Sequence, residues 1–428
     1  MLLVVICLAL ICVTVAIWRP VPAFALLICL VVFNSLISSF IDDATSGLVF
    51  GATKDAMLAI LFIKSLSNTN RVPTPLFVIP ALILILASAS ALQTPLAVQA
   101  IYGLRNDYEP IVLAVAACCL LRAEGRNTLI RGLALAANAA AVVALVTWRI
   151  GIPWLYTIGV LPVTSGPFPT SFFTQGSSEP RAFSPAPGPN ELGLVLAFAI
   201  VSVLASSEWG SARKALLIAL PVFALLATQS RSAILGAALG CVVLLLWPAI
   251  KNRSSIAVAA LVVVGVGATV GFSVYSSTRG QSEVDYSAAG HAASLREAFA
   301  SLFNSLMGVG VGQVGPRAVI YSDKAIHVES FFLLIGLEAG VLVLGLLLAL
   351  NIWAASRFAR SGKLQGWQGL AIVATSLPSQ ILLPAMQDGS TSFVYWTLLG
   401  AAVAATASSN GIFPPSQRPD GVLAHNRY

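Results

Sequence analysis

Charged residues are scarce in this sequence. Asp, Glu, Lys and Arg make up only 10% of the 428 residues, whereas hydrophobic residues make up 57%. In soluble domains about a quarter of the residues are charged, and the core of a soluble domain could not bury this many apolar residues. Most of the apolar surface must therefore face lipid.

Cysteine motifs and clustered basic residues are also missing. The six cysteines form no CxxC pair and have no nearby His, so they indicate packing residues rather than metal ligands. The net charge is +7, but Lys and Arg are scattered through short loops instead of forming one patch. We therefore expect no nucleic-acid partner.

Long apolar runs are abundant. A membrane-spanning helix needs roughly 20 mostly apolar residues, and up to 13 such runs lie at 2–17, 21–41, 47–66, 76–92, 111–121, 129–150, 192–206, 215–228, 233–250, 256–275, 328–355, 369–383 and 391–407. The sequence predicts an all-α polytopic membrane protein with 12–13 transmembrane helices. The count stays open because the run at 47–66 carries Lys54 and Asp55, and charges at mid-span are costly.

A single transmembrane domain is expected over residues 1–407, and a proline-containing disordered cytoplasmic tail over 408–428. No internal repeat or soluble domain is evident, and residues 1–19 lack the basic start and cleavage site of a signal peptide. We therefore expect the first run to remain as a span.

The basic residues predict the orientation of the spans. Cytoplasmic loops are enriched in Lys and Arg, and every second connection holds such residues: Arg19, Lys64 with Arg71, Arg122 with Arg126 and Arg131, Arg213 with Lys214, Lys251 with Arg253, and Arg357 with Arg360 and Lys363. This alternation places the N-terminus outside and the C-terminus inside. It also places two long loops, 153–190 and 276–326, on the non-cytoplasmic side.

The two outer loops carry distinct signals. The loop at 153–190 is rich in Pro, Ser, Thr and Gly and contains Arg181 shortly before Pro189-Asn190-Glu191. Unstructured loops of this length are usually functional or disordered. In the second loop, apolar residues from Leu295 to Leu306 share one helical face, which predicts a helix at the membrane interface.

A glycine-rich segment follows that helix. Residues 310–315 match GxGxxG formally, but a dinucleotide site needs a preceding strand and a following helix. We expect instead a turn that allows close backbone packing.

Several outer arginines are separate rather than clustered: Arg105, Arg149, Arg181, Arg231, Arg279, Arg296 and Arg317. Guanidinium groups bind phosphate through paired hydrogen bonds. Individual arginines that reach a common point from different loops would suit a diphosphate ligand. His327 begins the run at 328–355 and shares a helical face with Glu338.

The order of these motifs resembles the O-antigen ligase/polymerase superfamily of bacterial inner-membrane glycosyltransferases. The resemblance rests on Gly103-Leu104-Arg105, on Arg181 followed by Pro189-Asn190, and on the Ser-Arg pair within 228–233. It continues with Arg296 ahead of the glycines at 308–312, and with His327 to Phe332 followed by Glu338-Ala339-Gly340. Val328 stands where family members often have Asn after the histidine, and Met307 where they often have Pro.

The resemblance implies transfer of a glycan from an undecaprenyl-diphosphate donor to a glycan or lipid acceptor at the periplasmic face, with inversion and without metal or cofactor. Arg231 and Arg296 would neutralise the diphosphate, with Arg181 and Arg105 as further ligands. His327 would accept the proton of the acceptor hydroxyl or position that hydroxyl, and Glu338 or Glu329 would orient the imidazole ring. Other polysaccharide export proteins are possible partners.

Three alternatives remain open at this point, one of which is a membrane scaffold without chemistry, in which the outer arginines could be lost without harm. A polymerase joins lipid-linked repeat units, whereas a ligase moves a finished glycan to an acceptor, and no motif separates them. A transporter or flippase for a small anion or a lipid-linked glycan belongs to a different class. Transporters tend to show internal repeats and polar residues at mid-membrane, and here only Lys54 and Asp55 lie at mid-span.

Overall fold

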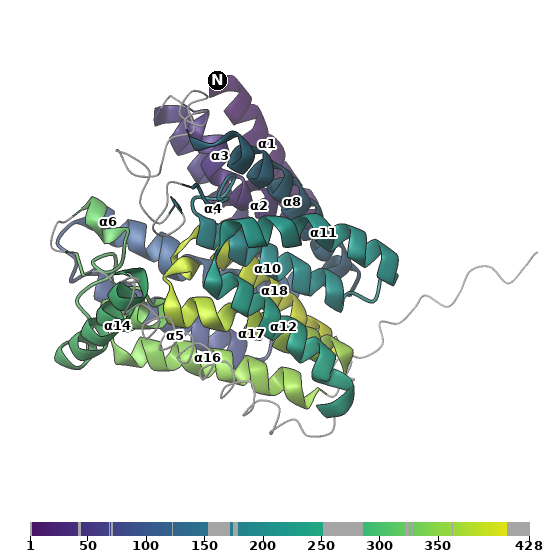
Figure 1. The fold of residues 1–428 in the computed structure, drawn as a ribbon. Coiled ribbons are helices and arrows are strands. Elements are labelled where there is room, and N and C mark those ends of the chain that lie inside the picture. Colours follow the sequence, from purple (N-terminus) through teal and green to yellow (C-terminus); the bar gives the residue numbers. More distant parts are fainter. Residues whose placement is uncertain are drawn as a thin grey trace, which may run out of the picture.

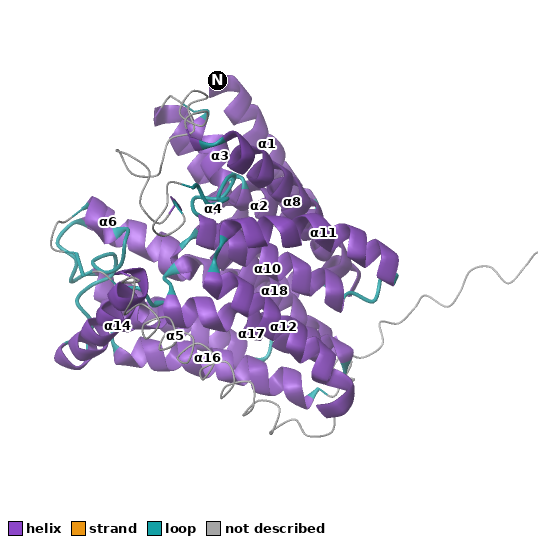
Figure 2. Cartoon of the chain, in the orientation of Figure 1, coloured by secondary structure: helices purple, strands orange, loops and turns teal. Residues whose placement is uncertain are grey.

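A computed structural model describes residues 2–41, 44–67, 69, 72–121, 123–152, 172–173, 179–250, 286–321, 325–326, 328–361 and 363–408. Helices dominate this part of the chain, and only two isolated bridges pair extended segments (Figure 2). The expected all-α class is confirmed for the described residues.

The helices follow the apolar runs closely. They are α1 (Leu2–Trp18), α2 (Pro20–Val32), α3 (Asn34–Ser39), α4 (Ala44–Leu66), α5 (Thr74–Ala91), α6 (Ala97–Gly103), α7 (Val112–Leu120), α8 (Ala123–Ile150), α10 (Pro189–Ala205), α11 (Ser211–Thr228), α12 (Arg231–Ile250), α14 (Tyr286–Asn304), α15 (Phe331–Ala339), α16 (Val341–Arg360), α17 (Leu364–Leu382) and α18 (Gly389–Ser408). Shorter turns are η2 (Leu104–Tyr108), η3 (Glu109–Ile111), η5 (Ala318–Ile320) and η6 (Ala385–Gln387).

Five of these helices, α4, α5, α8, α11 and α16, are long and apolar enough to cross a membrane. Four shorter apolar helices, α1, α2, α10 and α12, accompany them in the described part of the chain. The expected run at 256–275 and the tail at 409–428 lie outside the described residues. The helices fit an all-α membrane protein.

Two expected runs are each divided into two helices. The run at 21–41 breaks at Phe33, between α2 and α3. The run at 328–355 breaks at Gly340, which has a φ of 93° and separates α15 from α16. A positive φ is a conformation that glycine adopts readily and that ends a helix, so α15 is a short helix rather than the start of a long span.

Helices α10, α17 and α18 form the centre of the helical body (Figure 1). Most residues of α10 and α17 are buried, because other helices cover them on all sides. Small residues allow these helices to approach closely. A side-chain carbon at Gly236 would lie only 2.2 Å from the Thr375 carbonyl oxygen, and one at Gly400 only 2.2 Å from that of Ala114.

Candidate functional site

A tight turn between α11 and α12 places Arg231. Gln229 ends α11 in the left-handed region with a φ of 50°, and Arg231 begins α12. The backbone N–H groups of the first helical turn have no partners within the helix and give this end a partial positive charge. Arg231 is exposed at this end, so its own charge adds to that of the helix.

Arg181 is held against the same turn. Its Nε donates to the carbonyl oxygen of Thr228 at 2.7 Å, and a terminal nitrogen donates to Asn190 Oδ1 at 3.1 Å. The backbone N–H of Ala182 also donates to the carbonyl oxygen of Ala227, at 3.0 Å. Arg181 thus connects the loop before α10 to the end of α11. The structure brings together two of the arginines expected in the site.

We call Arg181 and Arg231 the arginine pair. The pKa of Arg181 is lowered to about 10, first by burial of the guanidinium and then, against the attraction of Glu191, by the positive charge of Arg231. Arg181 nevertheless stays charged at neutral pH. Two cations held near one another at a helix N-terminus repel each other, and a bound anion would relieve that repulsion.

Arg105 has a different environment. Its Nε lies 2.8 Å from Asp55 Oδ2, and a terminal nitrogen donates to the carbonyl oxygen of Gly51 at 3.1 Å. Both partners belong to α4. The Lys54 ammonium lies 5.1 Å from the ring centre of Phe393. The mid-span charges of α4 therefore have partners within the protein, and Arg105 serves as one of them.

The glycine-rich segment forms a turn pressed against α6 and α15. Gly308, Gly310, Gly312 and Gly315 all have positive φ values, and a side-chain carbon at Gly312 would lie 2.4 Å from the Gln99 carbonyl oxygen. The expected turn with close backbone packing is confirmed.

Glu338 supports this turn. Its carboxylate accepts a hydrogen bond from the backbone N–H of Gly312 at 2.7 Å and from the Tyr108 hydroxyl at 3.2 Å. The side chain is fully buried. Its observed contacts therefore hold the glycine-rich turn in place.

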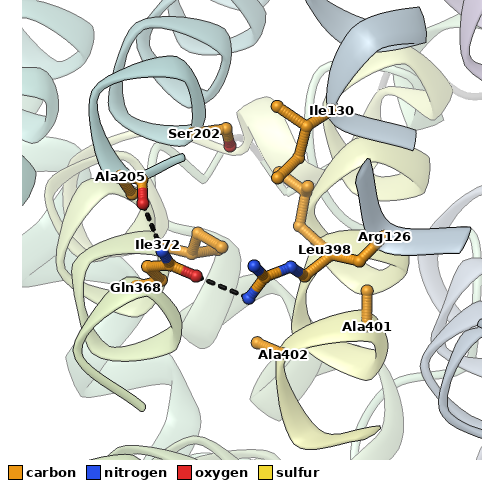
Figure 3. A pocket seen from close by; sticks show the side chains of 9 residues that line it. All are labelled: Arg126, Ile130, Ser202, Ala205, Gln368, Ile372, Leu398, Ala401 and Ala402. Atoms are coloured by element: carbon orange, nitrogen blue, oxygen red, sulfur yellow. Dashed lines mark hydrogen bonds between the residues drawn. The ribbon is translucent and has the colours of Figure 1, made fainter. Parts of the chain in front are cut away.

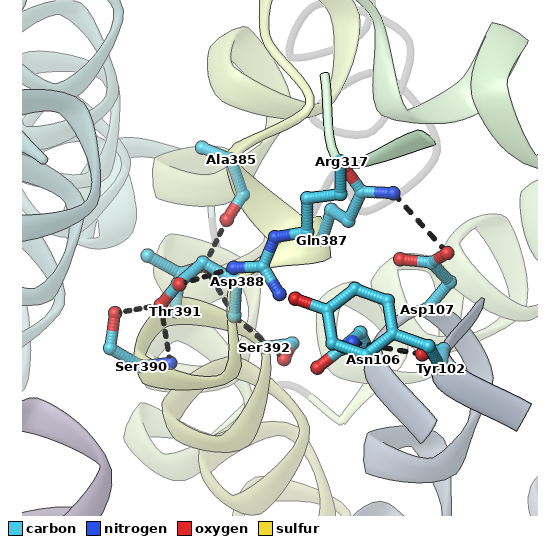
Figure 4. Close-up of polar contacts among 10 residues, drawn as sticks. All are labelled: Tyr102, Asn106, Asp107, Arg317, Ala385, Gln387, Asp388, Ser390, Thr391 and Ser392. Carbon is cyan, nitrogen blue, oxygen red and sulfur yellow. Dashed lines mark hydrogen bonds and ion pairs between the residues drawn. The ribbon is translucent and has the colours of Figure 1, made fainter. Parts of the chain in front are cut away.

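A buried polar group lies where this turn meets α18 (Figure 4). Arg317 pairs with Asp388 at 2.6 Å, and Gln387 Nε2 donates to Asp107 Oδ2 at 3.3 Å. Asp388 Oδ1 also accepts from the backbone N–H of Ser390 at 2.7 Å, at the start of α18. We call Arg317, Asp107, Gln387 and Asp388 the Arg317 cluster.

Carboxyl groups in this region have unusual pKa values. Burial raises the pKa of Asp107 to about 7, although Arg317 and the Gln387 hydrogen bond oppose the shift. The pKa of Glu191 is also raised to about 7, first by burial and then by the charge of Asp388, while Arg317 and Arg181 oppose it. Glu191 thus interacts with both the arginine pair and the Arg317 cluster. Carboxyl groups that titrate near neutrality often occur in functional sites.

Of this cluster, only Arg317 was expected from the sequence, as one of the separate outer arginines. Arg317 and Asp388 are 71 positions apart, and Asp107 and Gln387 are 280 positions apart. The charge alternation along the sequence gave one indication of this cluster, because it places all four residues in connections on the outer side. Only the fold shows that these connections meet.

The remaining expected residues lie apart or outside the described chain. Arg296 is exposed on α14, which packs against α15, whereas the arginine pair lies beside α10 and α12. Glu329 is half-buried just before α15. His327 lies outside the described residues, so its expected role stays a prediction.

A small cavity lies elsewhere, between α8, α10, α17 and α18 (Figure 3). Arg126 donates to Gln368 Oε1 at 2.6 Å, and Gln368 Nε2 donates to the carbonyl oxygen of Ala205. The other lining residues are mainly apolar, and Arg126 belongs to a connection expected to be cytoplasmic. The cavity is thus separate from the two polar groups described above.

No group of three or more His, Cys, Asp or Glu side chains is placed to hold a metal ion in the described segments. In comparisons with known proteins, no family model and no curated protein matches the chain.

Proposed function

We propose that this chain is an inner-membrane glycosyltransferase that transfers a glycan from an undecaprenyl-diphosphate donor to a glycan or lipid acceptor at the periplasmic face. The arginine pair is the observation that supports this proposal most directly. Arg181 and Arg231 come from different connections and are held beside one helix N-terminus. Such an arrangement suits a diphosphate, which carries charge on several oxygens.

The arginine pair would act mainly in the transition state. As the acceptor oxygen attacks the anomeric carbon, the bond to the diphosphate breaks and its electron pair passes to a phosphate oxygen. Fixed positive groups stabilise that developing charge without reorganisation. His327 would take the proton of the acceptor hydroxyl, as the family resemblance implies. Attack opposite the leaving group inverts the anomeric carbon.

A transporter remains the alternative from another class. The sequence offers a transporter only two mid-span charges, Lys54 and Asp55. Asp55 pairs with Arg105, and Lys54 lies over the Phe393 ring. Because these charges are balanced within the protein, they require no transported ion, which favours the transferase.

A complementation experiment tests the proposal. The gene is deleted and replaced by wild-type, Arg231→Ala, Arg296→Ala or His327→Ala forms, and the lipid-linked glycans are profiled. We expect Arg231→Ala to cause lipid-linked glycan to accumulate, because its diphosphate is no longer stabilised as it leaves. Single repeat units would identify a polymerase, and full-length glycan would identify a ligase.

Arg360→Ala is the matched control. Arg360 is an exposed arginine in the last turn of α16, at the predicted cytoplasmic side. It should leave the glycan profile unchanged. A normal profile in cells that contain folded Arg231→Ala protein would refute the transferase proposal.

A further inference from the structure

Two tyrosines lie beside the Arg317 cluster. Tyr102 is in the last turn of α6, and Tyr321 directly follows η5. Their ring centres are 5.8 Å apart with the planes inclined at 59°, and both side chains are only half-buried. Figure 4 shows the hydroxyl end of Tyr102 pointing toward the Arg317 guanidinium. Aromatic surface and polar groups therefore meet at one place.

The local backbone also departs from a regular helix here. Asp107 lies in η2, a π-helical turn that follows α6 directly. Such turns are rare and occur frequently at functional sites. In this protein the π-helical turn is followed by a 3₁₀ turn, η3, before α7 begins. Tyr102, in the last turn of α6, and Asp107, in η2, thus come from one short stretch of the chain.

Asp107 has unused hydrogen-bonding capacity. The side chain is only 6% exposed. Its Oδ2 accepts from Gln387, whereas Oδ1 is buried and has no hydrogen-bond partner in the described part of the chain. Leaving a buried carboxylate oxygen unsatisfied is costly, and native proteins rarely do so without a reason. A hydroxyl group of a ligand would satisfy this oxygen.

Arg317 provides complementary donors. One terminal nitrogen pairs with Asp388, and a guanidinium group carries five N–H donors in all. About a quarter of the side chain remains exposed (26%). The group therefore combines a hydrogen-bond acceptor, a partly accessible donor and two aromatic rings.

This combination matches a sugar ring. A sugar presents an apolar C–H face that packs on aromatic rings, and hydroxyl groups at its edge that bond to carboxylate and guanidinium groups. Ligand sites typically pair aromatic contact with a few placed polar groups in this way. A simple anion would be repelled by Asp107 and Asp388, and an apolar ligand would leave Asp107 Oδ1 unsatisfied.

We propose that Tyr102, Tyr321, Asp107 and Arg317 form a subsite for a sugar ring of the glycan, with a sugar hydroxyl donating to Asp107 Oδ1. The inference rests on the proposed function and extends it. Glu191 interacts electrostatically with Arg181 on one side and with Arg317 and Asp388 on the other. A glycan bound here would thus lie close to a diphosphate held by the arginine pair.

Saturation-transfer NMR on the purified full-length protein in detergent micelles tests the subsite without any donor. The probes are free glucose, galactose, N-acetylglucosamine and rhamnose. We expect saturation of ring C–H protons in at least one of them. Tyr102→Ala and Tyr321→Ala should weaken that signal at least fivefold, whereas Tyr102→Phe, which keeps the ring, should retain most of it.

Asp107→Leu tests the hydrogen bond, and Phe223→Ala is the matched control. Asp107→Leu should weaken binding of the same sugar about tenfold, in line with the loss of one hydrogen bond. Phe223 is a 66% exposed ring on α11, and its loss should leave the signal unchanged. If Tyr102→Ala does not fold, Tyr321→Ala and Asp107→Leu decide the question.

Two results would overturn the subsite: no saturation transfer from any of the four sugars to wild-type protein, or an unchanged signal in folded Tyr321→Ala and Asp107→Leu. These results are distinct from failure of the proposed function. Sugar binding that depends on Tyr102, combined with a normal glycan profile in Arg231→Ala cells, would establish the subsite in a protein that is not the transferase. If lipid-linked glycan accumulates in Arg231→Ala cells but the wild-type protein binds none of the sugars, the transferase proposal is supported and the subsite is refuted.

Discussion

Positive charge is arranged differently in the arginine pair and in the Arg317 cluster. In the arginine pair, two guanidinium groups are held near one another at a helix N-terminus, so like charges add. In the Arg317 cluster, one guanidinium group lies among the carboxyl groups of Asp388, Asp107 and Glu191. A cluster of one cation among carboxyl groups stabilises the junction of distant segments, whereas two neighbouring guanidinium groups at a helix N-terminus are better suited to bind an external anion. The two regions should therefore respond differently to the same type of mutation.

The largest expected effect is a slower rate of glycan transfer when the arginine pair is disrupted. Arg181→Ala should slow glycan transfer by about 100-fold to 1,000-fold, the usual cost of losing one group that stabilises developing charge. Arg181→Lys keeps the charge but loses the planar paired donors, so it should restore transfer only in part. The measurement is the rate of transfer by purified protein from a lipid diphosphate donor.

Thermal denaturation of the same variants separates chemistry from folding, because Arg181 also bonds to Thr228 and Asn190. Folded Arg181→Ala protein that transfers at the wild-type rate would remove Arg181 from the site.

The next effect concerns the stability of the Arg317 cluster. Arg317→Met leaves the carboxyl groups of Asp388 and Asp107 without their cation, and breaking a buried ion pair costs about 3 to 5 kcal/mol. We expect a clear drop in apparent Tm in detergent. Arg317→Met with Asp388→Asn should recover part of it, because the asparagine keeps an acceptor for Ser390 without the charge.

The exposed pair Arg131–Glu208 provides the control, since 60% of the Arg131 side chain is exposed. Arg131→Met should lower stability much less than Arg317→Met, because an exposed ion pair contributes little. Equal losses in Arg317→Met and Arg131→Met would contradict the assignment of a stabilising role to the cluster.

Sequence patterns predicted the helices better than the site. Apolar runs predicted α4, α5, α8 and α11 closely, because a span needs a continuous apolar segment. The spacing from Leu295 to Leu306 likewise predicted α14. The break at Gly340 was missed, because the sequence of an apolar run does not reveal the φ of a glycine within it. The charge alternation identified Arg181 and Arg231 as outer arginines, but their proximity emerges only from the packing of α10 against α11 and α12.

A substitution in the glycine-rich turn that leads to Arg317 should lower stability less than the loss of Arg317 itself. Gly312→Ala forces a φ of +84° on alanine and brings its side-chain carbon within 2.4 Å of the Gln99 carbonyl oxygen. Backbone strain of this kind costs about 1 to 3 kcal/mol, which denaturation of the purified variant would measure. Gly345→Ala is the control, because no atom beyond the neighbouring residues and backbone of its own helix lies within 4 Å of its added carbon. In the middle of α16, that change should stabilise the protein by up to about 1 kcal/mol. Equal stability of the two variants would contradict the tight packing of the turn.

The pH dependence of stability is a separate test of the Arg317 cluster. Burial raises the pKa of Asp107 to about 7 in the folded protein, whereas an exposed Asp titrates near about 4. Between these values the folded state binds more protons than the unfolded state, so stability falls as pH rises from about 4 to about 7 and then levels off. The apparent Tm in detergent should follow this course.

Asp107→Asn should flatten this pH dependence only in part, because Glu191 also titrates near 7, and addition of Glu191→Gln should flatten it further. The groups that act on Asp107 are Arg317, Gln387 and Glu338, and none of them is changed in these variants. A Tm that rises over the same interval would show that Asp107 is ionised well below neutrality, and the Arg317 cluster would then be a fully charged network rather than a partly protonated one.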